Sequence, residues 1–206
     1  MTGTGGEAVL ALWVDIDPAD DAFFENWHSR EHVQERVGCP GWLRGSRFKA
    51  VTKSGRYLLF YDAETAAAFE SDVYYARLRA PTEMSRAIFS KFRNTWRTVC
   101  TVEHRLGEGI AAAALTLRLG ANDPVPFEAL AALEPARLDL LQGHKSVGQA
   151  HTVEKELRPA PDRQIERAIV GFFWSVEEAE KARAAHAPFA EVFALRHTVS
   201  KSDLGR

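Results

Sequence analysis

The stretch Phe23–His32, FFENWHSREH, places two histidines four residues apart, with a glutamate directly before the second. His28, Glu31 and His32 match H-x-x-E-H, the zinc-binding pattern of one metalloprotease class. A zinc protease also needs a distant further ligand and a fold with room for a peptide, and short motifs often match by chance. We therefore predict that the chain has no metal site.

General acid–base chemistry is a second use for the same residues. Imidazole titrates near neutral pH, so a histidine can take a proton from an acidic carbon or a phenol and return it elsewhere. We predict His32 as the catalytic acid/base, and His28 as a second catalytic residue that helps it or contacts the substrate. A nearby glutamate, Glu31 or Glu35, could orient a ring nitrogen.

A regular helix would point the two histidines toward solvent. At about 100° per residue, Trp27, Val33 and Val37 cluster on one side of the helix, and both histidines lie on the other. Two arrangements would still bring the histidines inside the protein. The helix could break near Ser29, or the apolar insert at residues 71–93 could fold over its polar face and enclose a pocket.

The elements that must position these residues follow from the hydrophobic pattern and from capping and turn residues. In the first half we expect a strand at Ala8–Ile16, a helix at Pro18–Arg36, strands at Trp42–Thr52 and Arg56–Tyr61, a helix at Asp62–Glu70, a helical insert at 71–93 and a strand at Thr95–His104. In the second half we expect a strand at Ile110–Leu119, a helix at Pro126–Gln142, strands at His144–Val153 and Ile165–Trp174, a helix at Val176–His186 and a strand at Phe189–Val199.

A faint internal repeat links the two halves. A shift of about 103 residues aligns Phe24 with Phe127, and a shift about one residue shorter aligns Gly41 with Gly143. Each half follows the order β-α-β-β-α-β, which is ferredoxin-like. We predict an α+β fold in which two ferredoxin-like halves form an intrachain α+β barrel as a pseudo-dimer. Residues 1–105 would carry the insert and the site, and residues 106–206 would lack the histidine motif.

The segments FENWHSREHVQERVGCPGWLRGSRF, RYLLFYD and FRNTWRTVC, within residues 8–104, resemble the EthD-like branch of the dimeric α+β barrel superfamily. An aromatic-x4-His pattern on the first helix, here Trp27 to His32, is typical of that branch. The resemblance implies that two such sheets pack into a barrel, usually between subunits. Relatives in the superfamily isomerise lactones, oxidise polyphenols without a cofactor, cyclise polyketides or bind haem.

Composition excludes several other classes of protein. The 206 residues carry a formal net charge of −2 with both signs spread along the chain, which argues against a nucleic-acid binder. Two cysteines cannot build a disulfide framework. We expect neither a signal peptide nor a membrane span, because the N-terminal apolar run is short and has no basic start. These features predict a cytoplasmic protein.

Four further side chains are predicted to bind the substrate. Arg47, on an expected strand, could pair with a carboxylate, although a solvent-facing arginine is the commoner case. Tyr74 and Tyr75 belong to the insert, and Trp96 to an expected strand. Most of the strand aromatics are expected to fill the core, and some could line a cavity for a flat apolar ligand.

These observations predict a small enzyme that needs no cofactor, an isomerase, lyase or oxygenase acting on an aromatic or lactone-like intermediate. The alternative is a non-catalytic protein that binds a small apolar or aromatic ligand in the same pocket. Haem is a minor alternative cofactor, with His104, His151 or His197 as its axial ligand. Binding to nucleic acid or membrane is not expected, and the two-half chain could form a homodimer.

Overall fold

The computed structural model describes residues 5–205. The strands are β1 (Ala8–Asp15), β2 (Trp42–Ala50), β3 (Arg56–Ala63), β4 (Arg93–Gly107), β5 (Ala113–Leu119), β6 (Arg137–Gly143), β7 (Arg167–Phe173) and β8 (Glu191–Ser200). The α-helices are α1 (Asp21–Trp27), α2 (Val33–Val37), α3 (Asp72–Arg79), α4 (Glu83–Phe89), α5 (Phe127–Ala131), α6 (Val153–Glu156) and α7 (Val176–His186). A π-helical segment, His28–His32, joins α1 to α2, and short 3-10 helices lie at Pro18–Asp20, Ala66–Glu70 and Lys201–Asp203.

The strands form one closed antiparallel barrel in the order β1-β3-β2-β8-β5-β7-β6-β4, with β4 returning to β1. The predicted fold class, two ferredoxin-like halves as a pseudo-dimer, is wrong. A ferredoxin-like sheet is open and leaves two edge strands unpaired, whereas here β2 pairs with β8 and β4 pairs with β6. Pairing satisfies the backbone groups that open edges would expose.

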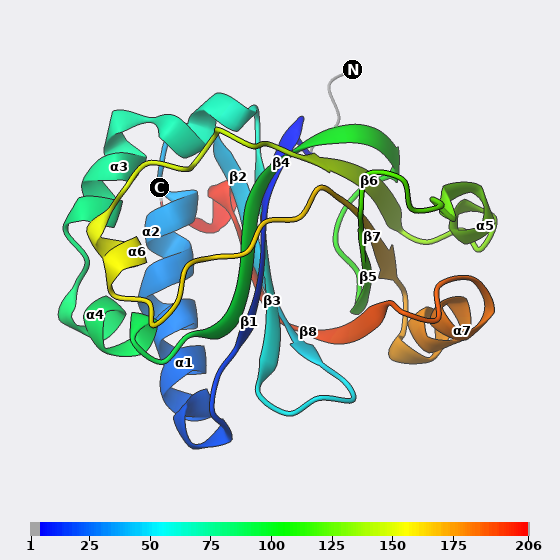
Figure 1. Ribbon diagram of the computed structural model, residues 1–206, viewed down its shortest axis with the longest axis horizontal. Coiled ribbons are helices and arrows are strands. Elements are labelled where there is room, and N and C mark those ends of the chain that lie inside the picture. The colour runs from blue at the N-terminus through cyan, green and yellow to red at the C-terminus, as the bar shows by residue number, and fades with distance from the viewer. Residues whose placement is uncertain (1–4, 206) are drawn as a thin grey trace.

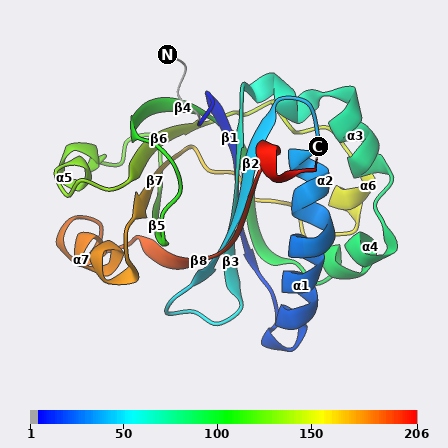
Figure 2. The ribbon, with the colours of Figure 1, turned by 180° about the vertical axis from the view of Figure 1, so that it is seen from behind.

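Three apolar layers hold the barrel together. The barrel interior collects side chains from the strands of both halves, such as Trp13, Phe60 and Phe172. A second layer lies outside β1, β2, β3 and β4, beneath α1–α4 and α6, and a third lies outside β5–β8, beneath α5 and α7 (Figures 1 and 2). We call these the first and the second outer layer.

The barrel interior is filled with side chains and contains its own ion pairs. Arg137 donates to both Asp62 and Asp139, and all three side chains are buried. The indole Nε1 of Trp13 donates to Thr116 Oγ1 at 3.1 Å. Buried charges of this kind require paired partners. The interior is therefore a packed core.

The second half departs most from the predicted elements. The helix expected at Pro126–Gln142 ends at Ala131, because Glu134 has a positive φ of 53° and Pro135 follows it. The next strand is β6, so the strand expected at His144–Val153 is wrong. The repeat also aligned unlike positions, since Gly41 precedes β2 whereas Gly143 ends β6. By contrast, α7 has the predicted bounds.

In the first half, the helix expected at Asp62–Glu70 is also wrong. Strand β3 continues to Ala63, and only the 3-10 helix Ala66–Glu70 follows it. The insert is helical as predicted and forms α3 and α4.

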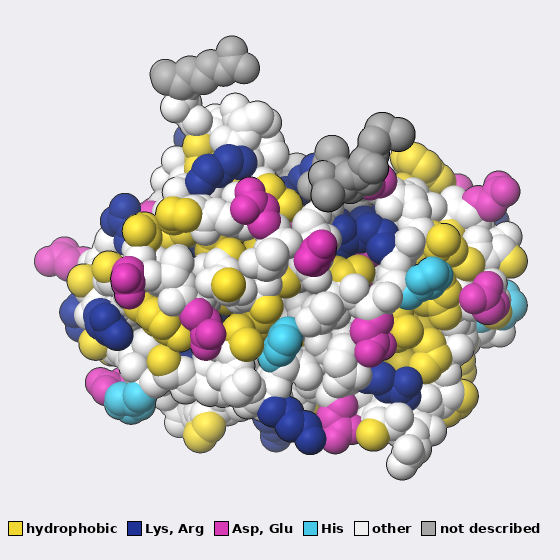
Figure 3. All heavy atoms as spheres, turned by 90° about the horizontal axis from the view of Figure 1, so that it is seen from above, with side chains coloured by type: hydrophobic (Ala, Val, Ile, Leu, Met, Phe, Trp, Pro, Cys, Tyr) yellow, Lys and Arg dark blue, Asp and Glu magenta, His cyan; other side chains and the backbone are white. Residues whose placement is uncertain are grey.

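The surface seen from above carries side chains of both charge signs with no extended patch of one sign (Figure 3). Within residues 5–205, no helix combines the length and the apolar character that crossing a membrane would need.

Candidate active site

The π-helical segment brings both histidines into the first outer layer. It spans His28–His32, and the N–H of Val33 bonds to the carbonyl of His28, five residues earlier. A π-helical turn is wider than an α-helical turn, so it rotates the following residues about the helix axis. Side chains before and after the segment can therefore both face the sheet. His28 is fully buried and His32 is 7% exposed. The helical-wheel prediction of solvated histidines was wrong for this reason.

The insert also covers the helix, as the second expected arrangement required. Glu31, on the π-helical segment, accepts hydrogen bonds from Thr82 Oγ1 at 2.5 Å and from Ser85 Oγ at 3.2 Å. Ser85 Oγ in turn accepts from Trp27 Nε1 at 3.0 Å. These contacts tie α4 to the histidine-bearing helix and fix the orientation of Trp27.

His28 is held by the sheet beneath it. Its Nε2 and the hydroxyl of Tyr61 on β3 lie 3.0 Å apart and share a hydrogen bond, while Nδ1 is buried without a partner. Burial, with the nearby charges of Arg47 and His197, holds the pKa of His28 well below its ordinary value. His28 is therefore neutral near pH 7.

His32 lies against Trp27, with ring centroids 4.2 Å apart and planes tilted by 33°. Burial, followed by the charge of Arg36, holds the pKa of His32 well below its ordinary value. Its Nδ1 is buried and has no hydrogen-bond partner. A neutral imidazole in this state can accept a proton.

His32 also borders a small cavity of about 20 Å³, whereas His28 does not. This volume corresponds to about one water molecule. The wall combines aromatic side chains with three arginines, Arg36, Arg97 and Arg158. Tyr74 also lines it, and its hydroxyl accepts from Arg97 Nη2 at 2.9 Å.

One wall of the cavity comes from the other end of the chain. Residues 144–166, which we call the strap, connect β6 to β7 and carry α6 across to α3 and α4 (Figure 1). Glu154 on the strap forms a buried ion pair with Arg36 on α2, and both side chains are less than 5% exposed. The strap also bonds to β4, where Arg97 N donates to Arg163 O at 2.9 Å.

The four predicted substrate contacts lie in different places. Tyr74 is buried at the cavity beside His32, as described above. Tyr75 is only partly buried, and its hydroxyl donates to Glu70 at 3.4 Å. Arg47 donates to the carbonyl of Glu25 at 2.8 Å and lies on the His28 side, while Trp96 packs against the barrel interior. Of the four, Tyr74 alone lines the cavity beside His32.

Several cavity residues were not predicted from the sequence. Tyr61 and Arg97 lie on expected strands, and their alternation with buried neighbours could have placed them on the helix-covered face. Glu154 and Arg158 lie on the strap, whose sequence carries no periodic pattern that would have indicated their position.

The zinc alternative does not fit the described residues, and the three haem candidates lie in different surroundings. Glu31 is engaged by hydroxyls, and no group of three His, Cys, Asp or Glu side chains within residues 5–205 could hold a metal ion. His104 and His151 are exposed and line hollows that contain several charged residues, a poor match for an apolar macrocycle. His197 is half-buried near Arg47, whose charge lowers its pKa in addition to the effect of burial.

No protein-family model matches the chain, and no curated protein matches its sequence. Solved structures do share its fold. An anthrone oxidase-like protein superposes with a TM-score of 0.63 at 12% identity, over 98% of this chain and 97% of that chain.

Two proposed monooxygenases give similar results. The one from Lactobacillus acidophilus has a TM-score of 0.55 at 5% identity, over 95% of this chain and 97% of that chain. The one from Fusobacterium nucleatum has a TM-score of 0.54 at 7% identity, over 95% of each chain. At these identities the likeness establishes the fold alone, and it does not distinguish the EthD-like branch. The chain therefore shares the fold of these proteins, which is the fold that its resemblance to the dimeric α+β barrel superfamily implied.

Proposed function

We propose that this protein is a small enzyme that needs no cofactor and uses His32 as a general base on an aromatic substrate. One observation carries the proposal. A buried imidazole, whose pKa burial lowers, borders a small cavity whose wall also holds three guanidinium groups. Proton abstraction leaves an anion, and preorganised positive charge in a dry site stabilises an anion strongly.

Each cavity residue has a role in this proposal. His32 takes the proton, and Trp27 beneath it keeps the ring in place. Arg97 faces the developing negative charge, while Arg36 is already paired with Glu154 and Arg158 with Asp162. Tyr74 contacts the substrate and orients Arg97 through its hydroxyl. His28 supports His32 from the sheet side, with Tyr61 holding its ring.

Among isomerase, lyase and oxygenase, we favour oxygenase. The support is the likeness in fold to an anthrone oxidase-like protein and to two proposed monooxygenases. His32 would remove a proton from the acidic methylene of an anthrone-type substrate. The carbanion would then reduce dioxygen, form a C–O bond and lose water. The balanced reaction converts an anthrone and O₂ to an anthraquinone and water.

The cavity must widen to admit such a substrate, because about 20 Å³ holds no ring. We propose that α3, α4 and the strap move apart from the helix, since these segments cover it on the side away from the sheet. Closure afterwards would exclude water from the carbanion.

The remaining expectations enter the proposal unchanged. Residues 1–105 supply the base, and residues 106–206 supply part of the cavity wall through the strap. Membership of the EthD-like branch, a cytoplasmic location and a homodimer of this chain also belong to the proposal.

The test uses anthrone as the substrate and follows oxygen consumption together with the absorbance of anthraquinone. The unmodified protein should accelerate both at equal stoichiometry. His32→Ala should lower kcat by about 10²–10⁴-fold, the usual contribution of a positioned base. The control is His186→Ala. His186 is exposed at the end of α7, on the side of the barrel opposite His32.

Unchanged turnover in His32→Ala would remove this residue from the mechanism. If the protein binds anthrone without turnover, the non-catalytic binding function is the correct one.

A further inference from the structure

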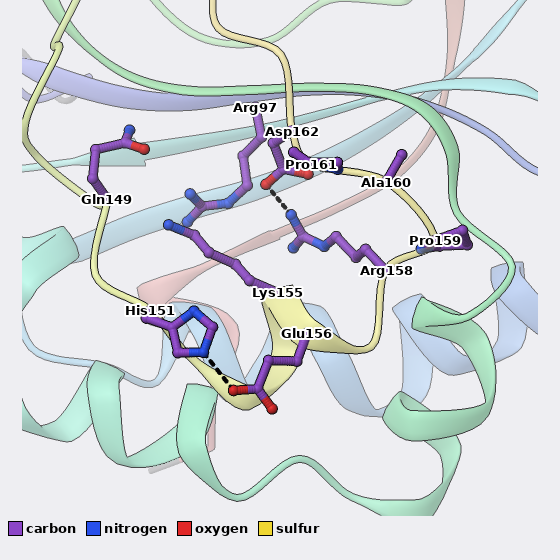
Figure 4. A pocket seen from close by; sticks show the side chains of 10 residues that line it. All are labelled: Arg97, Gln149, His151, Lys155, Glu156, Arg158, Pro159, Ala160, Pro161 and Asp162. Carbon is purple, nitrogen blue, oxygen red and sulfur yellow. Dashed lines mark hydrogen bonds and ion pairs between the residues drawn. The ribbon is translucent and has the colours of Figure 1, made fainter.

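An open hollow of about 430 Å³ lies between the strap and Arg97 of β4 (Figure 4). The close-up shows Arg97, Lys155 and Arg158 extending into the same space from β4 and from the strap. Arg97 and Arg158 line both the hollow and the inner cavity. The two spaces are therefore separated by side chains alone at these positions.

Positive charge exceeds negative charge in this hollow. Asp162 pairs with Arg158, and its charge also acts on Arg97 and Lys155. Glu154, on the same helix, points inward and is paired with Arg36. Glu156 pairs with His151 at the solvent-exposed rim, where the two side chains are 54% and 81% exposed.

Two of the three cations are only partly satisfied by the protein. Lys155 Nζ donates to the carbonyl of Gly148 at 2.8 Å, which leaves two of its three N–H donors without a partner among residues 5–205. Arg158 Nε is buried and has no hydrogen-bond partner. Burial, with the charges of Arg97 and Arg158, lowers the pKa of Lys155 to about 8. Like charges therefore lie close together, and a bound anion would reduce the repulsion between them.

We propose that this hollow binds the carboxylate of an aromatic acid, and that the substrate of the proposed enzyme is such an acid. The inference rests on the proposed function for the link to catalysis, but the anion site stands on its own contacts. A planar carboxylate matches the fork of an arginine and can bridge to Lys155. Pro159, Ala160 and Pro161 supply an apolar wall for the ring. An incoming carboxylate would add a second negative charge beside three cations, of which Arg158 is already paired with Asp162.

The experiment is calorimetric titration of the full chain with benzoate and with benzamide, its neutral counterpart. Benzoate should bind at least about tenfold more tightly than benzamide, because a charge-assisted pair replaces a neutral hydrogen bond. Lys155→Gln should weaken benzoate binding by about 3–10-fold and leave benzamide unchanged. Lys155→Arg should restore most of the affinity.

The matched control is Lys181→Gln on α7, where the lysine is exposed and far from the strap. It should leave benzoate binding unchanged, and melting curves of all variants should show that each is folded. Inorganic phosphate serves as a second anion. Phosphate should bind more weakly than benzoate if the hollow recognises an aromatic carboxylate. Equal binding of phosphate and benzoate would overturn that recognition.

Equal binding of benzoate and benzamide, or equal effects of Lys155→Gln and Lys181→Gln, would overturn the anion site. Failure of the proposed enzyme looks different. If anthrone is not turned over but benzoate binding still depends on Lys155, the anion site stands and the catalytic assignment falls. His32→Ala should change benzoate affinity by less than about twofold, because its ring does not line the hollow.

Discussion

The two outer layers of the barrel perform the same structural task with different side chains. Each covers the outer face of four neighbouring strands with helices. In the second outer layer, α5 and α7 bury apolar residues only, among them Phe127, Leu130 and Ala182. In the first outer layer, buried histidines and an ion pair lie among the aromatics.

The difference arises mainly from the covering segments, with Tyr61 of β3 and Arg97 of β4 as the polar side chains that the strands add. α7 is a regular helix of 11 residues, so its small apolar stripe alone faces the sheet. The helix of the first layer contains a π-helical segment, and the insert and the strap cover its outer side. The insert and the strap bury polar side chains of this helix and also supply their hydrogen-bond and ion-pair partners. A barrel stabilised by one plain layer can thus carry chemistry in the other.

The largest expected effect of a substitution comes from breaking the buried ion pair of the first outer layer. Glu154→Gln should lower the free energy of unfolding by about 3–5 kcal/mol, because Arg36 would remain buried without its anionic partner. Urea unfolding followed by circular dichroism measures this change. The control in the second layer is Glu177→Gln on α7, which is exposed and should change stability by less than about 0.5 kcal/mol.

A second variant checks the cause of that loss. The double replacement Arg36→Met with Glu154→Leu removes both charges, and it should cost less than Glu154→Gln alone. An equal or larger cost for the double replacement would show that packing at these positions, and not the unpaired charge, determines stability.

Stability should also depend on pH through the buried histidines. The pKa values of His28 and His32 are lowered in the folded state, so the unfolded chain takes up protons first as the pH falls below about 6.5. These two groups then leave stability unchanged above that pH and lower it below that pH. Between pH 8 and pH 5.5 each group should lower the free energy of unfolding by on the order of 1 kcal/mol.

Variants assign this pH dependence to the first layer. His32→Gln should remove about half of the decrease, and His186→Gln on α7 should remove none. A curve that is unchanged in His32→Gln would mean that other groups titrate in this range.

The sequence predicted the strands of the first half well because their apolar runs are long and are bounded by Pro and Gly residues. It also indicated that His32 could lie inside under an insert. Three features were not predictable. Closure of the barrel depends on pairs such as Arg47 with His197, which are far apart in the chain. The π-helical turn has no composition of its own, and Glu154 lies in a segment without periodicity.

Removing one hydroxyl probes the sheet side of the site. Tyr61→Phe should lower the free energy of unfolding by about 1–2 kcal/mol, because His28 Nε2 would be buried without its partner. The pKa of His28 should change with it, which histidine NMR signals can follow. A cost near zero would show that His28 finds another partner when Tyr61 is altered.

The smallest effect is expected at Tyr75, the neighbour of Tyr74 on α3. Tyr75 was predicted to bind the substrate, but its hydroxyl donates to Glu70 at 3.4 Å near the surface, whereas Tyr74 is 2% exposed and faces Arg97. Tyr75→Phe should change stability by less than about 0.5 kcal/mol, since exposed hydrogen bonds contribute little. It should also leave anthrone turnover unchanged, while Tyr74→Phe should reduce turnover because Arg97 loses its acceptor. Equal losses of turnover in the two variants would place the substrate on the outer side of α3, and the cavity beside His32 would no longer be the site.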